Sequence, residues 1–461
     1  MNMRLEKDSM GELEVPSEAL YGGNTRRAQL NFPISNLRFG RSFIKSLGLI
    51  KQSAAETNLD LGLIDKKLAD AIINSAQEVI DGEHDESFVV DIFQTGSGTS
   101  TNMNVNEVIS NLSISKLGGK IGSRDPVHPN DHVNKGQSSN DVIPTAIHIA
   151  AAISIKDDLI PSMKILESSL EKKSKEFWEI VKTGRTHLQD ATPIRLGQEF
   201  KGYCGQLKNS IRKIESALDE LSVLALGGTA VGTGIGMNPE FCGQVIRRIG
   251  EKTNINFKET DNHFQSQSTI DGIVSASGNV RSYAVSLMKI ANDIRWLGSG
   301  PRAGIGEIAL PEVQPGSSIM PGKVNPVIAE SITMICAQVM GNDQTVSIAG
   351  QSGNFELNVM MPVAAHNLLE SIEILSTGSR NFSEQCIEGL IATEKGPQMV
   401  NQGLAICTAL APKIGYDKAA DIAHKASESG ETIKEVAMRE TKLTSGELDE
   451  ILEPLSMTEP K

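Results

Sequence analysis

The chain has 461 residues and a formal net charge of −13, and 39% of its residues are hydrophobic while only 4% are aromatic. That length is enough for about three domains. The acidic balance argues against a nucleic-acid partner or an anionic membrane surface, because no large basic block offsets it. An anionic substrate would therefore need a local positive site.

No hydrophobic run reaches the roughly 18 residues of a membrane span, and polar residues 1–14 lack the hydrophobic segment of a signal peptide. The five cysteines are dispersed and show no metal-binding spacing. We therefore expect a cytoplasmic protein with reduced thiols, no membrane association, and no metal or other cofactor.

Helical periodicity begins within the first 80 residues, from about 42 to 53 and again from 65 to 80. A Gly/Ser/Thr-rich turn follows at 94–102, and hydrophobic residues come directly after it. This order predicts a loop that leads into the N-terminus of a helix. Residues 128–134 contain two histidines and an aspartate, but their proline and turn residues fit a polar loop better than a metal site.

Ser138, Ser139, Asn140 and Asp141 open a hydrophobic helix predicted from 142 to about 160. These side chains are more than one N-cap requires, and a helix start with surplus hydroxyls and free N–H groups suits a carboxylate ligand.

Two long hydrophobic stripes follow at 163–181 and 200–224, with the spacing of one helix face, and they predict the core of a helical bundle. Between them, residues 184–193 form a polar break around His187. A lone histidine is structural more often than catalytic, so the residues alone leave its role open.

The Gly-rich run at 227–236 follows a helix and lacks a preceding strand, so we reject a dinucleotide-binding interpretation. Another polar turn at 353–359 precedes a helix predicted from 361 to 375. After about residue 394, shorter helices with glycine breaks indicate a small C-terminal helical domain.

A segment dense in Gly and Pro, 298–326, separates helical patterns at 283–297 and 327–347. A long loop between helices is a linker or a functional lid. This one carries two hydroxyls, a cation and an amide, which together with backbone N–H groups suit a small anionic substrate. We expect Asn325 to be the N-cap of the next helix and Pro326 its first residue.

Together these motifs resemble the class II (iron-independent) fumarases of the fumarase/aspartase superfamily, over almost the whole chain. The resemblance rests on these segments: 7–11, 95–107, 128–131, 136–141, 184–193, 225–234, 316–326, 353–359 and 414–420. The string 316–326 marks the superfamily as a whole. Ser139, Gly322 and the segment 353–359 favour a fumarase, and aspartate ammonia-lyase is the alternative.

The resemblance implies an all-α fold with three domains at 1–137, 138–393 and 394–461. It implies a homotetramer whose twenty-helix core takes five helices from each chain, with each active site built from loops of three subunits. The implied substrate is a small dicarboxylate, fumarate or malate, and no cofactor is implied. A non-catalytic member of the superfamily should have lost some of the lid or histidine residues, which are all present here.

The resemblance also implies roles for individual residues. Ser317 on the closing lid would act as the base, and a His187–Glu330 pair would handle the water. Substrate contacts are implied for Ser97, Gly98, Thr99, Ser138, Ser139, Asn140, Thr186, Ser318, Lys323, Val324 and Asn325. A second, peripheral dicarboxylate site would use His128, Pro129, Asn130 and Asp131. The family usually has a basic residue three positions before that histidine, whereas this chain has Asp125, which places the second site in doubt.

Overall fold

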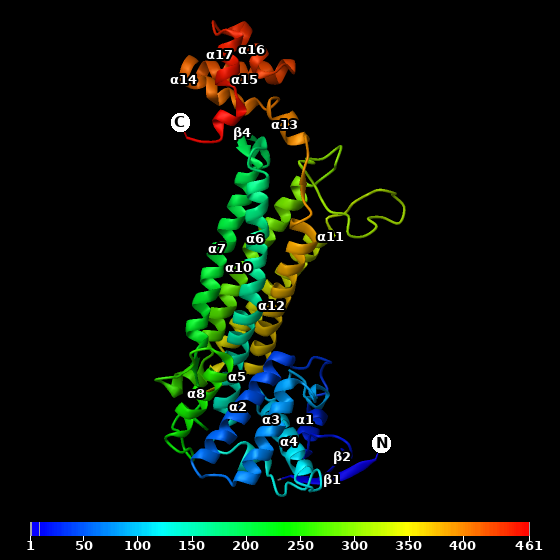
Figure 1. Cartoon of the computed structure of the whole chain (residues 1–461), viewed down its shortest axis with the longest axis vertical. Helices are drawn as coiled ribbons and strands as arrows, with labels where there is room; N and C mark the ends of the chain where they lie inside the picture. Colours follow the sequence, from blue (N-terminus) through cyan, green and yellow to red (C-terminus); the bar gives the residue numbers. More distant parts are fainter. Residues whose placement is uncertain (1, 9, 461) are drawn as a thin grey trace. The chain divides into compact units, whose positions relative to one another are not determined.

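The structure is a computed structural model that describes residues 2–8 and 10–460. Helices dominate it (Figure 1), and within the described part of the chain every strand lies in a two-stranded pair. The all-α expectation is therefore confirmed.

The elements of the first half of the chain are β1 (Met3–Asp8), β2 (Gly11–Pro16), α1 (Gly23–Asn31), α2 (Arg41–Asp60), α3 (Lys66–Asp81), η1 (Asp85–Ser87), α4 (Thr99–Lys116), η2 (Pro129–Val133), α5 (Ser139–Ser154), η3 (Ile155–Leu159), α6 (Ile160–Glu176), β3 (Val181–Thr186), β4 (Gln189–Arg195), α7 (Leu196–Leu221) and β5 (Val223–Leu224).

The elements of the second half are α8 (Phe241–Thr253), β6 (Lys258–Glu259), α9 (His263–Ser268), α10 (Asp271–Leu297), β7 (Ile308–Ala309), α11 (Val327–Gly350), β8 (Gly353–Asn354), β9 (Leu357–Asn358), α12 (Met361–Phe382), η4 (Ser383–Ile387), β10 (Ile391–Ala392), α13 (Lys395–Val400), η5 (Leu404–Leu410), α14 (Ala411–Ile414), α15 (Tyr416–Ser429), α16 (Ile433–Glu440), α17 (Ser445–Ile451) and η6 (Pro454–Met457).

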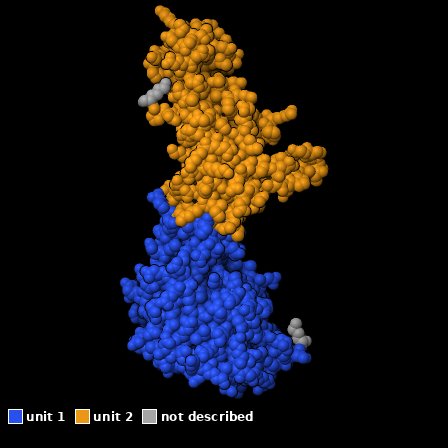
Figure 2. All heavy atoms as spheres, in the orientation of Figure 1, with its two compact units in different colours: residues 1–161, 212–284, 337–376 blue, residues 162–211, 285–336, 377–461 orange. Residues whose placement is uncertain are grey.

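The chain divides into two compact units that are discontinuous in sequence (Figure 2). Unit 1 contains residues 1–161, 212–284 and 337–376, and unit 2 contains residues 162–211, 285–336 and 377–461. The helices α7, α10, α11 and α12 therefore each contribute residues to both units. The predicted domains are consecutive ranges, and their boundaries stay a prediction.

The core of unit 1 is organised around α2, which packs against α3, α5 and α8. Phe43, Leu47 and Ile50 recur at steps of four and three along α2, and all three are buried. This face explains why the helix forms, since burying one hydrophobic stripe stabilises a helix more than intrinsic propensity does. The helix extends to Asp60, beyond the predicted end near 53.

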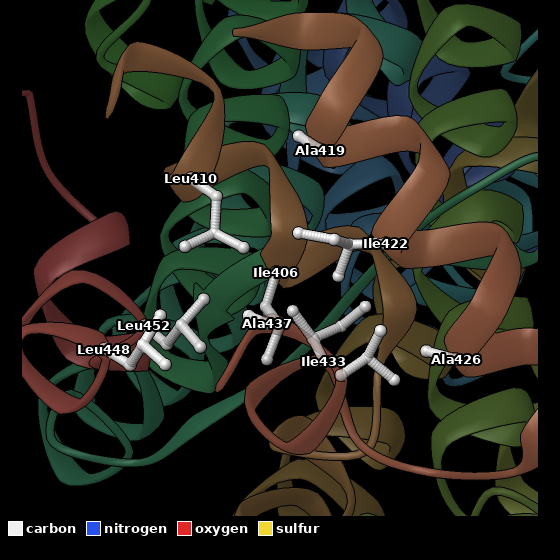
Figure 3. Close-up of a cluster of buried hydrophobic side chains, with 10 residues drawn as sticks. Ile406, Leu410, Ala419, Ile422, Ala426, Ile433, Ala437, Leu448 and Leu452 are labelled. Carbon is white, nitrogen blue, oxygen red and sulfur yellow. The ribbon is translucent and has the colours of Figure 1, made fainter. Parts of the chain in front are cut away.

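In unit 2, hydrogen bonds between side chains join neighbouring long helices. Tyr203 on α7 donates to Asp293 on α10 at 3.0 Å, and Ser383, just after α12, lies 2.8 Å from Ser169 on α6. The C-terminal helices α15, α16 and α17 enclose a hydrophobic cluster with η5 (Figure 3). The members of that cluster are Ile406, Leu410, Ala419, Ile422, Ala426, Ile433, Val436, Ala437, Leu448 and Leu452.

The predicted helix at 163–181 was wrong at both ends. The helix that begins as α5 continues through the wider π-helical turn η3 into α6, and it ends at Glu176. Pro161 has no N–H for the carbonyl four residues earlier, and the wider turn just before it accommodates that loss. At the other end, Val181 belongs to β3, whose hairpin with β4 replaces the predicted polar break.

Candidate active site

Three of the predicted substrate-binding hydroxyls meet at the starts of α4 and α5 in unit 1. Ser97 Oγ lies 2.7 Å from Thr99 Oγ1, which in turn lies 2.7 Å from Ser139 Oγ. We call Ser97, Thr99 and Ser139 the hydroxyl cradle. Because α4 and α5 both begin here, their positive dipole ends favour a carboxylate at this point.

Gly98 allows the two helix starts to approach each other. It is the N-cap of α4 in the left-handed conformation, with φ of +73°. A Cβ atom at this position would lie 2.9 Å from Cγ2 of Ile143 on α5. A side chain here would therefore strain the backbone and push α4 away from α5.

The polar residues at the start of α5 have separate roles. Ser138 forms a capping box with Asp141, while the Asn140 side chain donates to the Ala230 carbonyl at 2.8 Å. Ser139 is left for the hydroxyl cradle. Capping alone therefore does not account for this motif, in agreement with the sequence argument.

Asp141 ties the Gly-rich run at 227–236 to the start of α5. Its buried carboxylate accepts hydrogen bonds from the backbone N–H groups of Ser138, Gly227 and Thr229 at 3.0, 3.1 and 3.0 Å. Burial raises the pKa of the Asp141 carboxyl, while the three N–H donors act to lower it. The Gly-rich run thus bends around a carboxylate of the chain itself.

The lid loop between α10 and α11 lies in unit 2, and Figure 1 shows it reaching away from these helices. Its tip is a type II turn: Lys323 N–H donates to the Met320 carbonyl at 3.3 Å, Pro321 takes the second position, and Gly322 takes the third with φ of +77°. Among its predicted site residues, Ser318, Lys323 and Val324 are exposed.

Ser317 and Asn325 organise the inside of this loop. Ser317 Oγ accepts hydrogen bonds from the N–H groups of Ile319 and Met320 at 3.2 and 3.0 Å. The Asn325 side chain donates to the Gly316 carbonyl. The prediction that Asn325 is the N-cap was wrong, because α11 begins at Val327 and the Pro326 carbonyl accepts its first helical bond, from Glu330.

His187 stands at the tip of the β3–β4 hairpin in unit 2. His187 and Leu188 are the two central residues of its turn, with φ of +57° and +59°. Two positive φ values are typical of a type I′ turn, which normally takes Asn-Gly. Strained non-glycine residues of this kind are retained mainly at functional sites, and both side chains are exposed, as is that of Thr186.

A buried ionic network holds the base of this hairpin. Glu307 receives two hydrogen bonds from Arg185, at 2.8 and 3.1 Å, and lies 3.0 Å from Lys182. Lys182 also pairs with Glu199 at 2.7 Å. Burial acts to lower the pKa of Arg185, but its hydrogen bonds with Glu307 prevail and raise it.

Sequence reasoning missed this network. Glu307 is an acidic residue in a Gly-rich segment, and Arg185 lies 122 positions earlier, so no local spacing relates them. Glu307 lies in the first part of the lid loop, and its backbone carbonyl accepts a hydrogen bond from the N–H of Thr393. The carboxylate of Glu307 therefore joins the hairpin that carries His187 to the first part of the lid loop.

Glu330 lies in the first turn of α11. Within the described residues, His187 and Glu330 make no hydrogen bond or ion pair with each other in one chain. The resemblance places them in a site shared by three subunits, so their pairing stays a prediction.

The turn at His128 is more ordered than the predicted polar loop. Residues 129–133 form a π-helical turn, and His128 Nδ1 accepts from the N–H groups of Asn130 and Asp131, both at 3.2 Å. Asp131 Oδ2 lies 3.3 Å from the same nitrogen. Because that nitrogen accepts from two backbone groups, we do not count the Asp131 contact as an ion pair. Pro129 is buried within this turn.

Two family models match the sequence: one described as Lyase over residues 11–341, and one described as Fumarase C C-terminus over residues 406–459. The chain is also 50% identical over 455 residues to the "Fumarate hydratase class II" of Photorhabdus laumondii, and 98% of each protein is covered. The chain belongs to the class II fumarate hydratase family.

This class II fumarate hydratase family member also matches relatives from animals over its whole length. It is 49% identical over 463 residues to the mitochondrial fumarate hydratase of Homo sapiens, covering 100% of this chain and 91% of that protein. A crystal structure of the class II fumarase of Schistosoma mansoni matches it with a TM-score of 0.96 and 40% identity, over 99% of each chain. No helix in the described part of the family member is long and hydrophobic enough to cross a membrane.

Proposed function

We propose that this chain is a fumarate hydratase, which adds water reversibly to fumarate to give (S)-malate. The observation that carries the proposal is the full-length likeness to class II fumarate hydratases. The hydroxyl cradle supports it, since hydroxyls and N–H groups at two helix starts suit one carboxylate of a dicarboxylate. The rival activity, an aspartate ammonia-lyase, is not favoured by these relatives.

The proposed chemistry runs through a carbanion. In the dehydration direction a base removes the proton at C3 of malate, and the electron pair moves into the neighbouring carboxylate to give an aci-carboxylate. Hydroxide then leaves C2 with a proton from an acid, and the double bond forms. The intermediate carries extra negative charge at one carboxylate, so the site must hold fixed donors there before the reaction starts.

We propose Ser317 as the base. A free serine hydroxyl is a very weak acid, so its alkoxide must be strongly stabilised. The two N–H groups that donate to Ser317 Oγ provide such stabilisation. Lys323 on the same loop would add positive charge near the substrate once closure excludes water.

For the departing hydroxide we propose the His187–Glu330 pair. Histidine has an unperturbed pKa near 6.5, and a paired carboxylate would raise it, so the imidazolium could supply the proton near neutral pH. The strained turn supports a catalytic role for His187, because a purely structural hairpin would not need a bulky residue at a positive φ.

We further propose a homotetramer with a twenty-helix core. Large hydrophobic side chains on α10 and α11 in unit 2 support it, since Val285, Trp296 and Met334 are 51, 52 and 67% exposed in the single chain. A cytoplasmic location is supported by the five free thiols.

The three-domain division at 1–137, 138–393 and 394–461 also stays a proposal. Its last range contains the hydrophobic cluster of Figure 3 and the segment matched by the C-terminal family model. A second dicarboxylate site at His128–Asp131 is opposed by Asp125, which puts a negative charge where a basic residue would help.

The experiment that tests the proposed activity follows the ultraviolet absorbance of fumarate after mixing with the purified protein, with and without ammonium. A hydratase consumes fumarate equally under both conditions. Consumption that requires ammonium and yields aspartate would identify an aspartate ammonia-lyase and refute the proposal. Absence of consumption under both conditions would also refute it.

A further inference from the structure

Two of the segments that carry the hydroxyl cradle are joined by a lysine to which neither the motifs nor the proposed chemistry assign a role. Lys51 belongs to the hydrophobic helix α2 and is 0% exposed. Its ammonium donates three hydrogen bonds, to the side-chain oxygens of Asn102, Asn134 and Gln137 at 2.9, 2.8 and 3.0 Å. An ammonium has three donors, so these contacts use its full capacity.

The lysine fixes the direction of all three amides. Because an ammonium can only donate, each amide must turn its oxygen inward and its NH2 group away. The NH2 of Asn134 donates to the Gln137 carbonyl at 3.1 Å, and the NH2 of Gln137 donates to the Val133 carbonyl at 3.2 Å. The ammonium thereby sets the conformation of the loop that enters α5.

Two of the acceptors of Lys51 lie close in sequence to cradle residues, one on α4 and one just before α5. Asn102 follows Thr99 by three residues on α4, so both lie on the same side of that helix. Gln137 immediately precedes Ser138, the N-cap of α5, and Ser139 follows it. The starts of α4 and α5 meet where the hydroxyl oxygens of Thr99 and Ser139 lie 2.7 Å apart. Lys51 therefore connects the first turn of α4 with the loop that leads into α5.

Keeping a cation at this position is costly for stability. Burial lowers the pKa of Lys51 to about 7, against the opposing influence of Asp141. A hydrophobic side chain would avoid this cost, since buried charges are generally no better for stability than well-packed hydrophobic residues. Packing therefore does not explain why a lysine occupies this position, whereas a role in the predicted anion site does.

We propose that Lys51 is a positioning residue for the hydroxyl cradle, which holds the starts of α4 and α5 at the spacing that one substrate carboxylate requires. The inference rests on the proposed function, because it assumes that the cradle binds a dicarboxylate. Lys51 acts on the substrate through these amides and not by direct contact.

The test compares Lys51→Met with wild type in steady-state kinetics with fumarate. We expect KM to rise by at least about tenfold, the effect of one lost oriented hydrogen bond to a charged ligand, while kcat at saturation changes by less than about threefold. An unchanged KM would overturn the proposal, as would an equal loss in kcat with no change in KM.

Lys173→Met is the matched control. Lys173 is also a buried lysine, and its ammonium donates to the Leu390 carbonyl at 2.7 Å and to Glu176. It contacts none of the cradle residues, so its replacement should lower the thermal midpoint but leave KM unchanged. A similar rise of KM in both variants would show that lost stability raises KM in general, and would overturn the specific role of Lys51.

Gln137→Met keeps the test decisive if Lys51→Met does not fold. It removes one acceptor of Lys51 and leaves the lysine in place, so we expect KM to rise by about threefold. The KM of the double variant Lys51→Met/Gln137→Met should be no higher than that of Lys51→Met alone, because both substitutions break the same contact. Unchanged KM in Gln137→Met would overturn the proposal.

Calorimetric binding of succinate, a dicarboxylate that cannot react, separates the proposed hydratase activity from the proposed role of Lys51. If wild type lacks hydratase activity, the proposed function fails, and the succinate Kd of the variants still tests Lys51. If wild type hydrates fumarate and Lys51→Met binds succinate with an unchanged Kd, only the Lys51 proposal fails.

Discussion

Glu307→Gln should destabilise unit 2 and impair the hairpin that carries His187. The carboxylate of Glu307 is the shared partner of Lys182 and Arg185, and the Lys182 side chain is 1% exposed. Removing one member of a buried ion pair costs about 3–5 kcal/mol, because the remaining charge stays buried without compensation. Lys182 keeps Glu199 as a partner, so we expect the lower end, about 3 kcal/mol.

The same substitution should reduce kcat by at least about tenfold. Arg185 is two residues before His187 and would lose one of its two bonds to this side chain, because the NH2 group of glutamine cannot accept a hydrogen bond. A displacement of a catalytic group by about 1 Å can cost as much as 10²-fold in rate. Glu307→Asp keeps the negative charge, so it should lose less unfolding free energy and less kcat than Glu307→Gln.

Urea denaturation, monitored by circular dichroism, measures the stability change, with Glu179→Gln as the control. Glu179 also pairs with an arginine, Arg195 at 3.3 Å, but its side chain is 81% exposed. Exposed pairs contribute about 0–1 kcal/mol, so this variant should unfold close to wild type. If Glu307→Gln and Glu179→Gln unfold at the same urea concentration, the reasoning about the buried network is wrong.

Three further predictions follow. Ser317→Ala and His187→Asn should each lower kcat by at least about 10²-fold without changing the oligomer seen by gel filtration; turnover at the wild-type rate in either variant would remove that residue from the mechanism. Leu188→Asn should raise stability by up to about 1 kcal/mol, because asparagine tolerates a positive φ better, and an unchanged or lower thermal midpoint would contradict this. The pKa of Lys51 is about 7 in the fold and about 10.4 when unfolded, so the unfolded chain holds more protons between these values. The unfolding free energy of wild type relative to Lys51→Met should therefore rise with pH from about 7 to 10, by up to about 1.4 kcal/mol per unit; a pH-independent difference in urea titrations would refute it.

Local patterns predicted the helices well where one hydrophobic face is buried. The stripe at 65–80 corresponds to α3, Lys66–Asp81, and the stripe at 200–224 to α7, Leu196–Leu221. The β3–β4 hairpin escaped prediction because its strands lack a regular polar alternation and its turn is His-Leu in place of Asn-Gly. Periodicity indicates which face is buried, but it carries little information about a hairpin stabilised by buried ions.

The same limit applies to the site. The cap at Ser138 could be predicted because capping is a property of neighbouring residues. The contacts of Lys51 with Asn102 and of Arg185 with Glu307 span 51 and 122 positions, and only the tertiary fold brings them together. A lysine inside the hydrophobic helix α2 was the one available sign of the first contact, since buried lysines are rare unless they are paired.

The most direct test of the proposed activity is proton NMR of fumarate incubated with the purified protein in D2O without ammonium. The account predicts malate that carries a single deuteron at C3 in one configuration relative to the C2 hydroxyl, because one positioned group delivers one deuteron to C3 as the hydroxyl adds to C2. Unreacted fumarate, or malate labelled at random, would contradict a stereospecific hydratase acting through the lid serine.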